Sequence, residues 1–304
     1  MSTHTVSLAL PAAYRSDDVL AFHARDAEGV SEQVSKGKAG ETRNARIRKA
    51  VVLGGVPVLL DVTLTPEEAS CRIDADGELD DTVLALAHDA LRSTLALRID
   101  PAPFAAFVQD DSLFAPLVER QPGLRIVQSA TVFEALTWAI IGQQINLPFA
   151  ISLRRTFIEQ AGRPHSSGMR CYPEAVDVAR LDLEALTTRK FSRAKAETLL
   201  RVAHLAASGA LPLDQHADPE HAAAALLAVK GIGPWTVNYT LLRGYGYADC
   251  SLHGDVAIRT AIGRLQGTTE KPGIADTEAW LAAYRPHRTM AAAYLWASLS
   301  PPAG

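Results

Sequence analysis

Two features of the C-terminal half could do chemistry together: a Gly-Ile-Gly sequence at Gly231, Ile232 and Gly233, and an isolated acid, Asp255. Glycines on both sides of one aliphatic residue let a chain turn sharply with positive φ. The free amides of such a turn, and of a helix opened by Pro234, suit an anion such as phosphate. Asp255 follows Gly233 by 22 residues. A carboxylate held there could stabilise a cationic sugar or activate a water molecule.

Each feature also has a purely structural interpretation. A Gly-x-Gly sequence between helices is typical of a packed αα-hairpin, in which Ile232 lies between the helices. Asp255 precedes an apolar helical pattern and would serve as its N-cap. Trp235 and Tyr239, which follow the turn, would fit a hydrophobic core. The residues alone leave these alternatives open, although the short range that joins turn, aromatics and acid favours a site.

Helices must position these residues. Beyond Asp100-Pro101 the strand pattern stops, and Pro or Gly separates a series of helical patterns. We predict helices at 102–109, 113–120, 130–144, 148–162, 173–179, 182–188, 192–208, 218–229, 234–244, 255–266, 276–283 and 286–298.

The first hundred residues have a different pattern. Residues 4–10, 56–64 and 69–73 are strand-like, as is the apolar end of 31–53, and Gly54-Gly55 indicates a hairpin turn. Pro57 suggests an edge strand or a strand start. Ser16 is expected to cap a short helix, and residues 80–97 have a wide apolar helical stripe. We therefore predict an α+β protein: an N-terminal α/β domain with an antiparallel sheet (1–112), then a larger all-α domain (113–304).

Composition narrows the class of protein. The chain has 304 residues, 48% of them hydrophobic, with no run of the roughly 18 apolar residues that a membrane span needs. The N-terminus has no basic segment before its apolar stretch, so a signal peptide is not expected. Cys71, Cys171 and Cys250 are far apart, which argues against disulfides, a zinc site or an iron–sulfur cluster. A reducing, cytoplasmic compartment fits.

The charge distribution bears on nucleic-acid binding. Residues 1–129 carry 13 Lys and Arg against 19 Asp and Glu, and residues 130–304 carry 17 against 15. Neither part has the strongly basic surface of a protein that binds DNA mainly through counterion release. Backbone amides and helix dipoles would therefore have to supply much of any contact with DNA.

The sequence around these residues closely resembles a known family. LLAVKGIGPWTVNYTLLRG (226–244) with LHGDVAIR (252–259) looks like the helix–hairpin–helix–Gly/Pro–Asp motif of base-excision DNA glycosylases. Residues 122–145 (PGLRIVQSATVFEALTWAIIGQQI) and 285–296 (RPHRTMAAAYLW) are similar to further segments of the 3-methyladenine DNA glycosylase II (AlkA-type) group. The resemblance covers nearly the whole chain and implies a TBP-like N-terminal domain.

The resemblance implies a monomeric, cytoplasmic, nucleoid-associated bacterial enzyme that hydrolyses alkylated bases such as 3-methyladenine and 7-methylguanine from double-stranded DNA. No cofactor and no membrane are implied. Asp255 falls on the catalytic aspartate. Pocket residues fall on Phe22, Trp235, Tyr239, Val256 and Trp296. DNA contacts fall on Gln143, the wedge position Gln144, Gly231, Ile232, Gly233, Trp235 and Thr236. A monovalent ion is conceivable on the carbonyls of Leu227, Val229 and Ile232. The aromatic wall would attract a cationic base by roughly 0.5–2 kcal/mol.

This sequence departs from the family pattern at Gln144, Val256 and His287, which leaves the substrate range open. Glycosylase–lyases of the superfamily carry a Schiff-base lysine where this chain has Trp235, so a lyase is the less favoured alternative. Lys230 precedes the turn and is expected in solvent or at a phosphate. A non-enzymatic damaged-DNA-binding module is the other alternative. No metal cluster, phosphate loop or nucleophile triad supports a metabolic enzyme.

Overall fold

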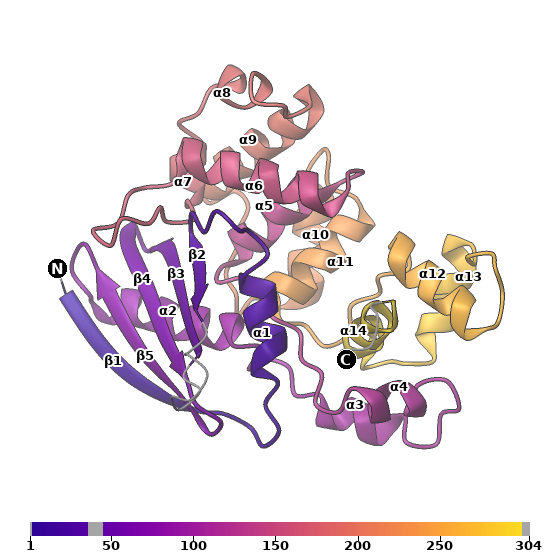
Figure 1. Ribbon diagram of the computed structural model, residues 1–304. Coiled ribbons are helices and arrows are strands. Elements are labelled where there is room, and N and C mark those ends of the chain that lie inside the picture. The colour runs from indigo at the N-terminus through magenta and orange to yellow at the C-terminus, as the bar shows by residue number, and fades with distance from the viewer. Residues whose placement is uncertain (1, 36–44, 300–304) are drawn as a thin grey trace.

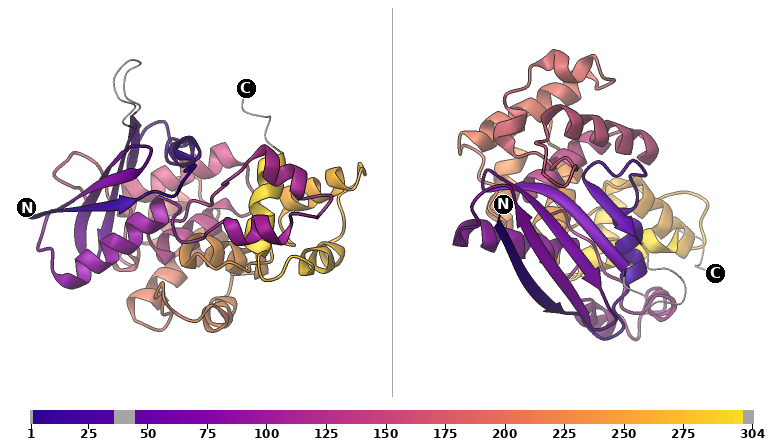
Figure 2. Two further views of the ribbon diagram at one scale, coloured as in Figure 1. Left: turned by 90° about the horizontal axis from the view of Figure 1, so that it is seen from below. Right: turned by 60° about the vertical axis from the view of Figure 1, so that its left-hand side comes forward.

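The computed structural model describes residues 2–35 and 45–299. The chain begins with a five-stranded antiparallel sheet in the order β1-β5-β4-β3-β2. Its strands are β1 (Ser2–Ala9), β2 (Glu32–Ser35), β3 (Ala45–Leu53), β4 (Val56–Leu64) and β5 (Glu68–Ala75). The sheet lies at one end of the molecule and the C-terminal helices lie at the other (Figures 1 and 2). The predicted antiparallel sheet is confirmed.

The predicted hairpin between β3 and β4 is also confirmed. Leu53 pairs with Val56, and the two turn residues, Gly54 and Gly55, have φ values of 57° and 82°. Glycine adopts two such conformations in succession without strain. Pro57 is the second residue of β4, so the predicted strand start is confirmed. The alternative, an edge strand, is wrong because β4 lies between β5 and β3. β2 was not predicted as a separate strand because its sequence is mostly polar.

Two helices accompany the sheet. α1 (Ser16–His23) lies beside the β2 edge of the sheet in Figure 1, whereas α2 (Asp81–Thr94) packs behind β3 and β4. Asp80 caps α2, because its carboxylate accepts the amide of Val83 at 2.8 Å. The expected cap at Ser16 is wrong: Ser16 is the first helical residue, and no side chain caps this helix. The adjacent Arg15–Asp18 ion pair stabilises its first turn instead.

The rest of the described chain is mainly helical, and each predicted helix is present, with ends that differ by about two residues. The helices are α3 (Ala102–Phe107), α4 (Ala115–Arg120), α5 (Val132–Gly142), α6 (Leu147–Ala161), α7 (Ala175–Val178), α8 (Leu183–Thr187), α9 (Arg193–Ala207), α10 (Pro219–Leu227), α11 (Pro234–Thr240), η1 (Leu241–Tyr245), α12 (Val256–Leu265), α13 (Ile274–Ala282) and α14 (Arg288–Ser298). Of these, η1 is a π-helical turn, where the sequence had predicted a continuous α-helix.

One segment of the helical region returns to the sheet. The amide of Tyr172 donates to the carbonyl of Ala50 at 2.9 Å, and its carbonyl accepts the amide of Val52 at 3.0 Å, along the C-terminal half of β3. Met169 and Cys171 cover the face of the sheet opposite α2. The contact of Tyr172 with β3 is an isolated β-bridge, and no strand of the described chain follows Pro101, as predicted. The predicted domain boundary at residue 112 stays a prediction.

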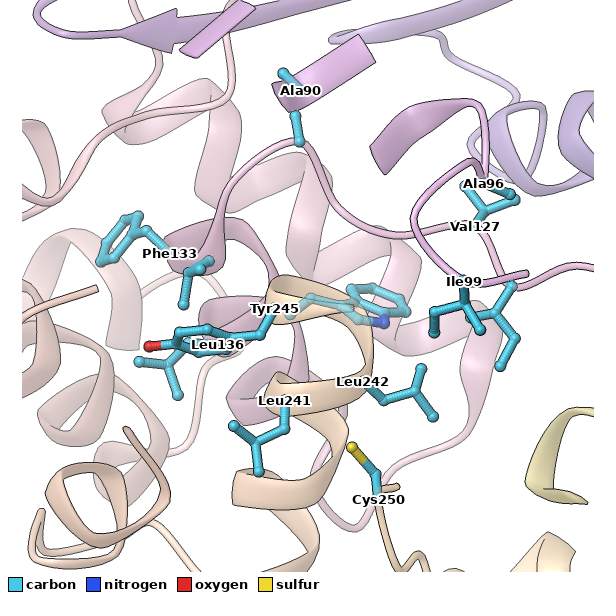
Figure 3. Packing of buried hydrophobic residues seen from close by; sticks show 14 of the residues in the cluster. Ala90, Ala96, Ile99, Val127, Phe133, Leu136, Leu241, Leu242, Tyr245 and Cys250 are labelled. Carbon is cyan, nitrogen blue, oxygen red and sulfur yellow. The ribbon is translucent and has the colours of Figure 1, made fainter. Parts of the chain in front are cut away.

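A hydrophobic core joins the sheet to the helices without a break. Figure 3 shows side chains of α5 (Phe133, Leu136) beside those of η1 (Leu241, Leu242), with Ala90 of α2 nearby. These apolar contacts fix η1 against α5. Residues of α5 and η1 are therefore held at fixed positions relative to the N-terminal sheet.

A buried ionic cluster crosses the same junction. Glu32 of β2 and Glu134 of α5 both pair with Lys49 of β3 and with Arg154 of α6; Lys49 and Arg154 lie 2.8 and 2.7 Å from Glu134. Burial raises the pKa of each carboxyl group, but the two cations outweigh it and hold the pKa of both below the usual value. The cluster thus stays charged while it fixes helices to sheet.

The three cysteines are free and buried, and burial raises the pKa of each thiol to about 12. Among the described residues, no helix is both long and apolar enough to span a bilayer. In the same residues, no group of three or more His, Cys, Asp and Glu side chains could hold a metal ion.

Candidate active site

Asp255 is the N-cap of α12, as expected, but its carboxylate has further partners. Oδ1 accepts the amide of Ile258 at 3.0 Å and the indole N–H of Trp296 at 3.3 Å. Oδ2 accepts the indole N–H of Trp235 at 2.9 Å. No Lys, Arg or His forms an ion pair with it in the described part of the chain. Neutral donors therefore hold the carboxylate in place, and its negative charge is available to a ligand. A simple N-cap needs only the amide.

The carboxylate faces a cavity of about 1230 Å³. The lining includes most of the site residues expected from the sequence: Phe22, Gln143, Gln144, Gly231, Gly233, Trp235, Thr236, Tyr239, Asp255, Val256 and Trp296. They come from α1, the loop after α5, the hairpin, α11, α12 and α14. Segments separated by more than two hundred residues thus meet at one concave site, whose volume exceeds that of an ordinary small-molecule pocket.

The aromatic residues form a connected wall. The rings of Trp235 and Tyr239 lie 5.1 Å apart at an interplanar angle of 32°, and Trp296 lies 6.4 Å beyond Tyr239. The indole of Trp138 donates to the Tyr239 hydroxyl at 3.0 Å. These rings are half-buried rather than core residues, apart from Trp138, so a flat ligand can contact their faces.

The two hairpin glycines have different conformations. Gly231 has a φ of 98°, and a Cβ there would lie 2.3 Å from Oγ1 of Thr198. Gly233 has a φ of −107° and open space where a Cβ would point, so the expected positive φ is wrong at this position. Gly231 serves the turn, whereas Gly233 leaves room for a ligand. Ile232 is buried, as expected, and does not line the cavity.

Several amides of the hairpin are available to a ligand. Among the described residues, the amides of Lys230, Gly231, Gly233, Trp235 and Thr236 donate to no backbone or side-chain oxygen. Those of Gly233, Trp235 and Thr236 lie at the start of α11, where the helix dipole is positive. The geometry suits an anionic oxygen without any lysine or arginine, as the charge distribution of the sequence requires.

The Gln143–Gln144 turn is tied to the hairpin. The Gln143 amide group donates to the carbonyl of Gly231 at 3.2 Å and to the hydroxyl of Thr236 at 3.0 Å. Lys195, buried on α9, donates to the carbonyls of Ile141 and Gln143. Gln144 is exposed and has a φ of 57°, an uncommon conformation for a residue other than glycine. Gln144, at the expected wedge position, is therefore exposed on a turn that these hydrogen bonds stabilise.

The cavity residues that were not predicted include Arg25, Trp138 and Arg243. Arg25 follows Phe22 by three residues and Arg243 follows Tyr239 by four. Helical spacing from a predicted pocket residue was the signal available for both arginines. Trp138 lies on α5, inside a segment that carried the family resemblance.

The positions that depart from the family pattern have separate surroundings. Val256 is 58% exposed at the cavity rim. His287 lies away from the cavity, its ring 5.5 Å from that of Phe107. His253 interacts with Ser251 through Nδ1 at 3.0 Å and lies beside rather than in the cavity. Lys230 is exposed, and its expected phosphate contact stays a prediction.

The monovalent-ion site also stays a prediction, but the backbone fits one. Among the described residues the carbonyls of Leu227 and Ile232 accept no hydrogen bond. The carbonyl of Val229 accepts only the amide of Ile232, at 3.0 Å. All three carbonyls thus retain lone pairs for a cation, which would brace the hairpin and take no part in bond cleavage.

Comparisons with known proteins identify the family. Residues 137–286 match the model of the HhH-GPD superfamily of base excision DNA repair proteins. The DNA-3-methyladenine glycosylase of Bacillus subtilis is 31% identical over 65% of this chain and 67% of its own length. The chain belongs to the HhH-GPD superfamily, and the curated relatives that it matches include several proteins named DNA-3-methyladenine glycosylase. It spans between 58% and 67% of the length of the first curated relatives it matches.

Solved structures agree on the fold. A 3-methyladenine DNA-glycosylase from Archaeoglobus fulgidus superimposes with a TM-score of 0.77 over 96% of this chain and 97% of that one, at 22% identity. The Schizosaccharomyces pombe 3-methyladenine DNA glycosylase Mag1, in complex with abasic DNA, gives a TM-score of 0.55 over 61% of this chain and 90% of that one, at 25% identity. The predicted α+β class and the recognised family are confirmed.

Proposed function

We propose that the chain is a monofunctional DNA glycosylase, which flips a damaged base out of double-stranded DNA and hydrolyses its N-glycosidic bond. The observation that carries this proposal is the Asp255 carboxylate, fixed by two indole N–H donors at the edge of an aromatic cavity beside the hairpin. Membership of a base excision repair superfamily supports it. Alkylated bases of the 3-methyladenine and 7-methylguanine type are the proposed substrates, by analogy with the named relatives.

The geometry suggests how the reaction proceeds. A base stacked in a duplex must be flipped out, at a cost of a few kcal/mol, before an enzyme can reach its glycosidic bond. In the cavity its faces would contact Trp235 and Tyr239, which places the sugar near Asp255. As the bond breaks, positive charge develops on the sugar, and the carboxylate stabilises it. Water then attacks C1′, and Asp255 is positioned to take a proton from it.

DNA is the proposed partner, held mainly by neutral groups. The unpaired amides of Gly231, Gly233 and Trp235 would bind one phosphate, and Gln144 would fill the gap left by the flipped nucleotide. A glutamine fills that gap with less apolar contact than an aliphatic side chain does. We propose that the protein acts as a monomer in the bacterial cytoplasm, at the nucleoid, where three free thiols would stay reduced.

The test is chromatography of bases released from double-stranded DNA treated with a methylating agent. The proposal predicts free methylated purines and intact strands that carry abasic sites. Strand cleavage with a species that borohydride traps covalently would show a glycosylase–lyase instead. Tight binding to damaged DNA without base release would show a binding module. Either of these results overturns the proposal.

A further inference from the structure

The two most exposed large hydrophobic side chains of the described chain line the same cavity. Leu147, the first residue of α6, and Val256, the first residue of α12, are each 58% exposed. Both belong to the lining of the cavity that Asp255 faces. Val256 directly follows that acid along the chain, whereas Leu147 follows the exposed Gln144 by three residues. An exposed apolar side chain thus lies beside the expected wedge.

The fold holds Leu147 in a defined position without burying it. Asn146 caps α6, because its side chain accepts the amide of Phe149 at 3.0 Å. Pro148 lies in the first turn of the helix, where its ring restricts φ. Ile145, which comes two residues earlier, packs against the hydrophobic core, whereas Leu147 has no part in that core. The backbone that carries Leu147 is therefore fixed, and its side chain is free to contact a ligand.

A single exposed leucine is ordinary on a protein surface, so its position matters more than its exposure. In the proposed complex the cavity receives a flipped nucleotide, and the base stack that remains is interrupted at that point. The side chains that enter an interrupted base step are apolar ones: Phe, Leu, Ile, Met or Pro. Gln144 is not of these types. Leu147 is the nearest exposed residue of these types along the chain that also lines the cavity.

Gln144 and Leu147 suit different parts of the opened duplex. The amide group of Gln144 can both donate to and accept from the edge of a base that has lost its partner. The side chain of Leu147 has no polar atom, and it gains free energy only where it leaves water, as it does between two base faces. Because it is exposed in the free protein, its burial would stabilise the complex with opened DNA and not the fold.

We propose that Leu147 is a second wedge, a positioning residue that inserts into the base stack next to the flipped nucleotide while Gln144 fills the gap. It contacts neither the departing base nor C1′. By stabilising the flipped state, it raises the fraction of bound DNA that presents a nucleotide to Asp255. This inference rests on the proposed glycosylase function and adds to it a residue that opens the duplex.

The first test is the fluorescence of 2-aminopurine, which rises when this base is unstacked. One duplex carries the probe in the base pair next to a stable abasic analogue, and a second carries it several pairs away. Each is measured with saturating wild type, Leu147→Ala, Leu147→Gln or Leu147→Met. Methionine keeps an apolar side chain that can enter a base step, whereas glutamine keeps the length and loses the apolar contact.

Ile274→Ala is the matched control for these variants. Ile274 is also the first residue of a helix, α13, and it is 53% exposed. It does not line the cavity. The control therefore removes a similar exposed apolar side chain from an equivalent helix position outside the proposed DNA contact.

We expect the wild type, Leu147→Met and Ile274→Ala to raise the signal next to the abasic analogue and not at the distant position. Leu147→Ala and Leu147→Gln should lose at least about half of this rise, because neither side chain can replace leucine between two bases. Single-turnover release of 7-methylguanine from duplex DNA should slow about tenfold in the same two variants, as the loss of one buried leucine implies, and stay within about threefold in Leu147→Met.

Equal signals and rates in Leu147→Ala and Ile274→Ala would overturn the inference, as would the absence of a rise with the wild type. A rise that Gln144→Ala removes and Leu147→Ala keeps would show that Gln144 is the sole wedge. Losses in Leu147→Met as large as those in Leu147→Ala would show a structural role instead. A wild type that releases no methylated base overturns the proposed function, and the signal from the abasic duplex still decides whether Leu147 enters the stack.

Discussion

The indole N–H of Trp235 donates to Oδ2 of Asp255 over 2.9 Å and so joins the first turn of α11 to the N-cap of α12. Trp235 comes two residues after Gly233, whose amide is one of the unpaired donors of the hairpin. The proposed phosphate site and the proposed catalytic carboxylate are therefore connected through one side chain. A displacement of the hairpin would move the carboxylate as well.

Replacing Trp235 by Phe should separate the hydrogen bond from the ring contact. Phenylalanine keeps an aromatic face toward Tyr239 but cannot donate to Asp255. A hydrogen bond to a charged group contributes about 1.5–3 kcal/mol, so we expect base release to slow by about ten- to a hundredfold. Trp296→Phe removes the longer bond, of 3.3 Å, and should cost less. Single-turnover rates measure both, and a larger loss in Trp296→Phe contradicts this ranking.

The hairpin glycines should respond differently to alanine. Gly231→Ala forces a Cβ against Thr198 at a positive φ, so it should destabilise the protein by about 2 kcal/mol or more. The methyl group of Gly233→Ala meets no neighbour, so the free energy of unfolding of this variant should lie within about 0.5 kcal/mol of the wild-type value. Its methyl group would instead approach the bound phosphate and weaken DNA binding. Chemical denaturation and anisotropy with an abasic duplex test the pair; equal stabilities would contradict the assigned roles.

Much of the site could be predicted because its signals are local. The Gly-Ile-Gly turn, Pro234 and Asp255 lie within 25 consecutive residues, and helix periodicity located the elements around them. The positive φ expected at Gly233 was wrong, because one left-handed residue is enough for this turn. The cap expected at Ser16 was wrong for another reason. Several polar residues lie near the start of this helix, and only the structure shows that none of them accepts a backbone amide there.

The arginines of the cavity were missed, because spacing from Phe22 and Tyr239 was their only local signal and their contacts depend on tertiary packing. Arg25, in the turn after α1, reaches Trp138 of α5 only in the folded chain, and Arg243 lies on a π-helical turn that periodicity does not distinguish from an α-helix. The return of Tyr172 to β3 likewise joins residues more than a hundred positions apart. Such pairings leave no local pattern in a single sequence.

Removing the Lys195 ammonium should loosen the turn that presents Gln144. Lys195→Met leaves the carbonyls of Ile141 and Gln143 without their donor, at a cost of about 1–3 kcal/mol. Urea denaturation should show the loss, and an abasic duplex should bind more weakly. Lys271→Met, at an exposed lysine, is the control for stability. Equal free energies of unfolding in Lys195→Met and Lys271→Met would show that Lys195 does not stabilise the turn.

Acid should weaken the junction between sheet and helices. Lys49 and Arg154 hold the folded-state pKa of Glu32 and Glu134 below the ordinary glutamate value of 4.5, so the unfolded state binds protons first as the pH falls. The stability that these two carboxylates contribute is fully present above about pH 4.5. It is lost below that pH, as the pH falls through their folded-state pKa values.

Glu134→Gln tests this assignment. It should cost about 3–5 kcal/mol at neutral pH, because Lys49 and Arg154 remain buried with less opposing charge. It should also reduce the acid dependence of stability. The measurement is the free energy of unfolding at a series of pH values between 3 and 7, and an acid limb as steep as that of the wild type would exclude the cluster as its cause.

The most direct measurement for the central claim is single-turnover release of 7-methylguanine by Asp255→Asn. Asparagine caps a helix as well as aspartate does, so the fold and the affinity for abasic DNA should be kept. Only the charge opposite the developing sugar cation is lost, and the rate should fall by at least about a hundredfold. Wild-type rates in Asp255→Asn would contradict the assignment of Asp255 as the catalytic carboxylate, and with it the account of this site.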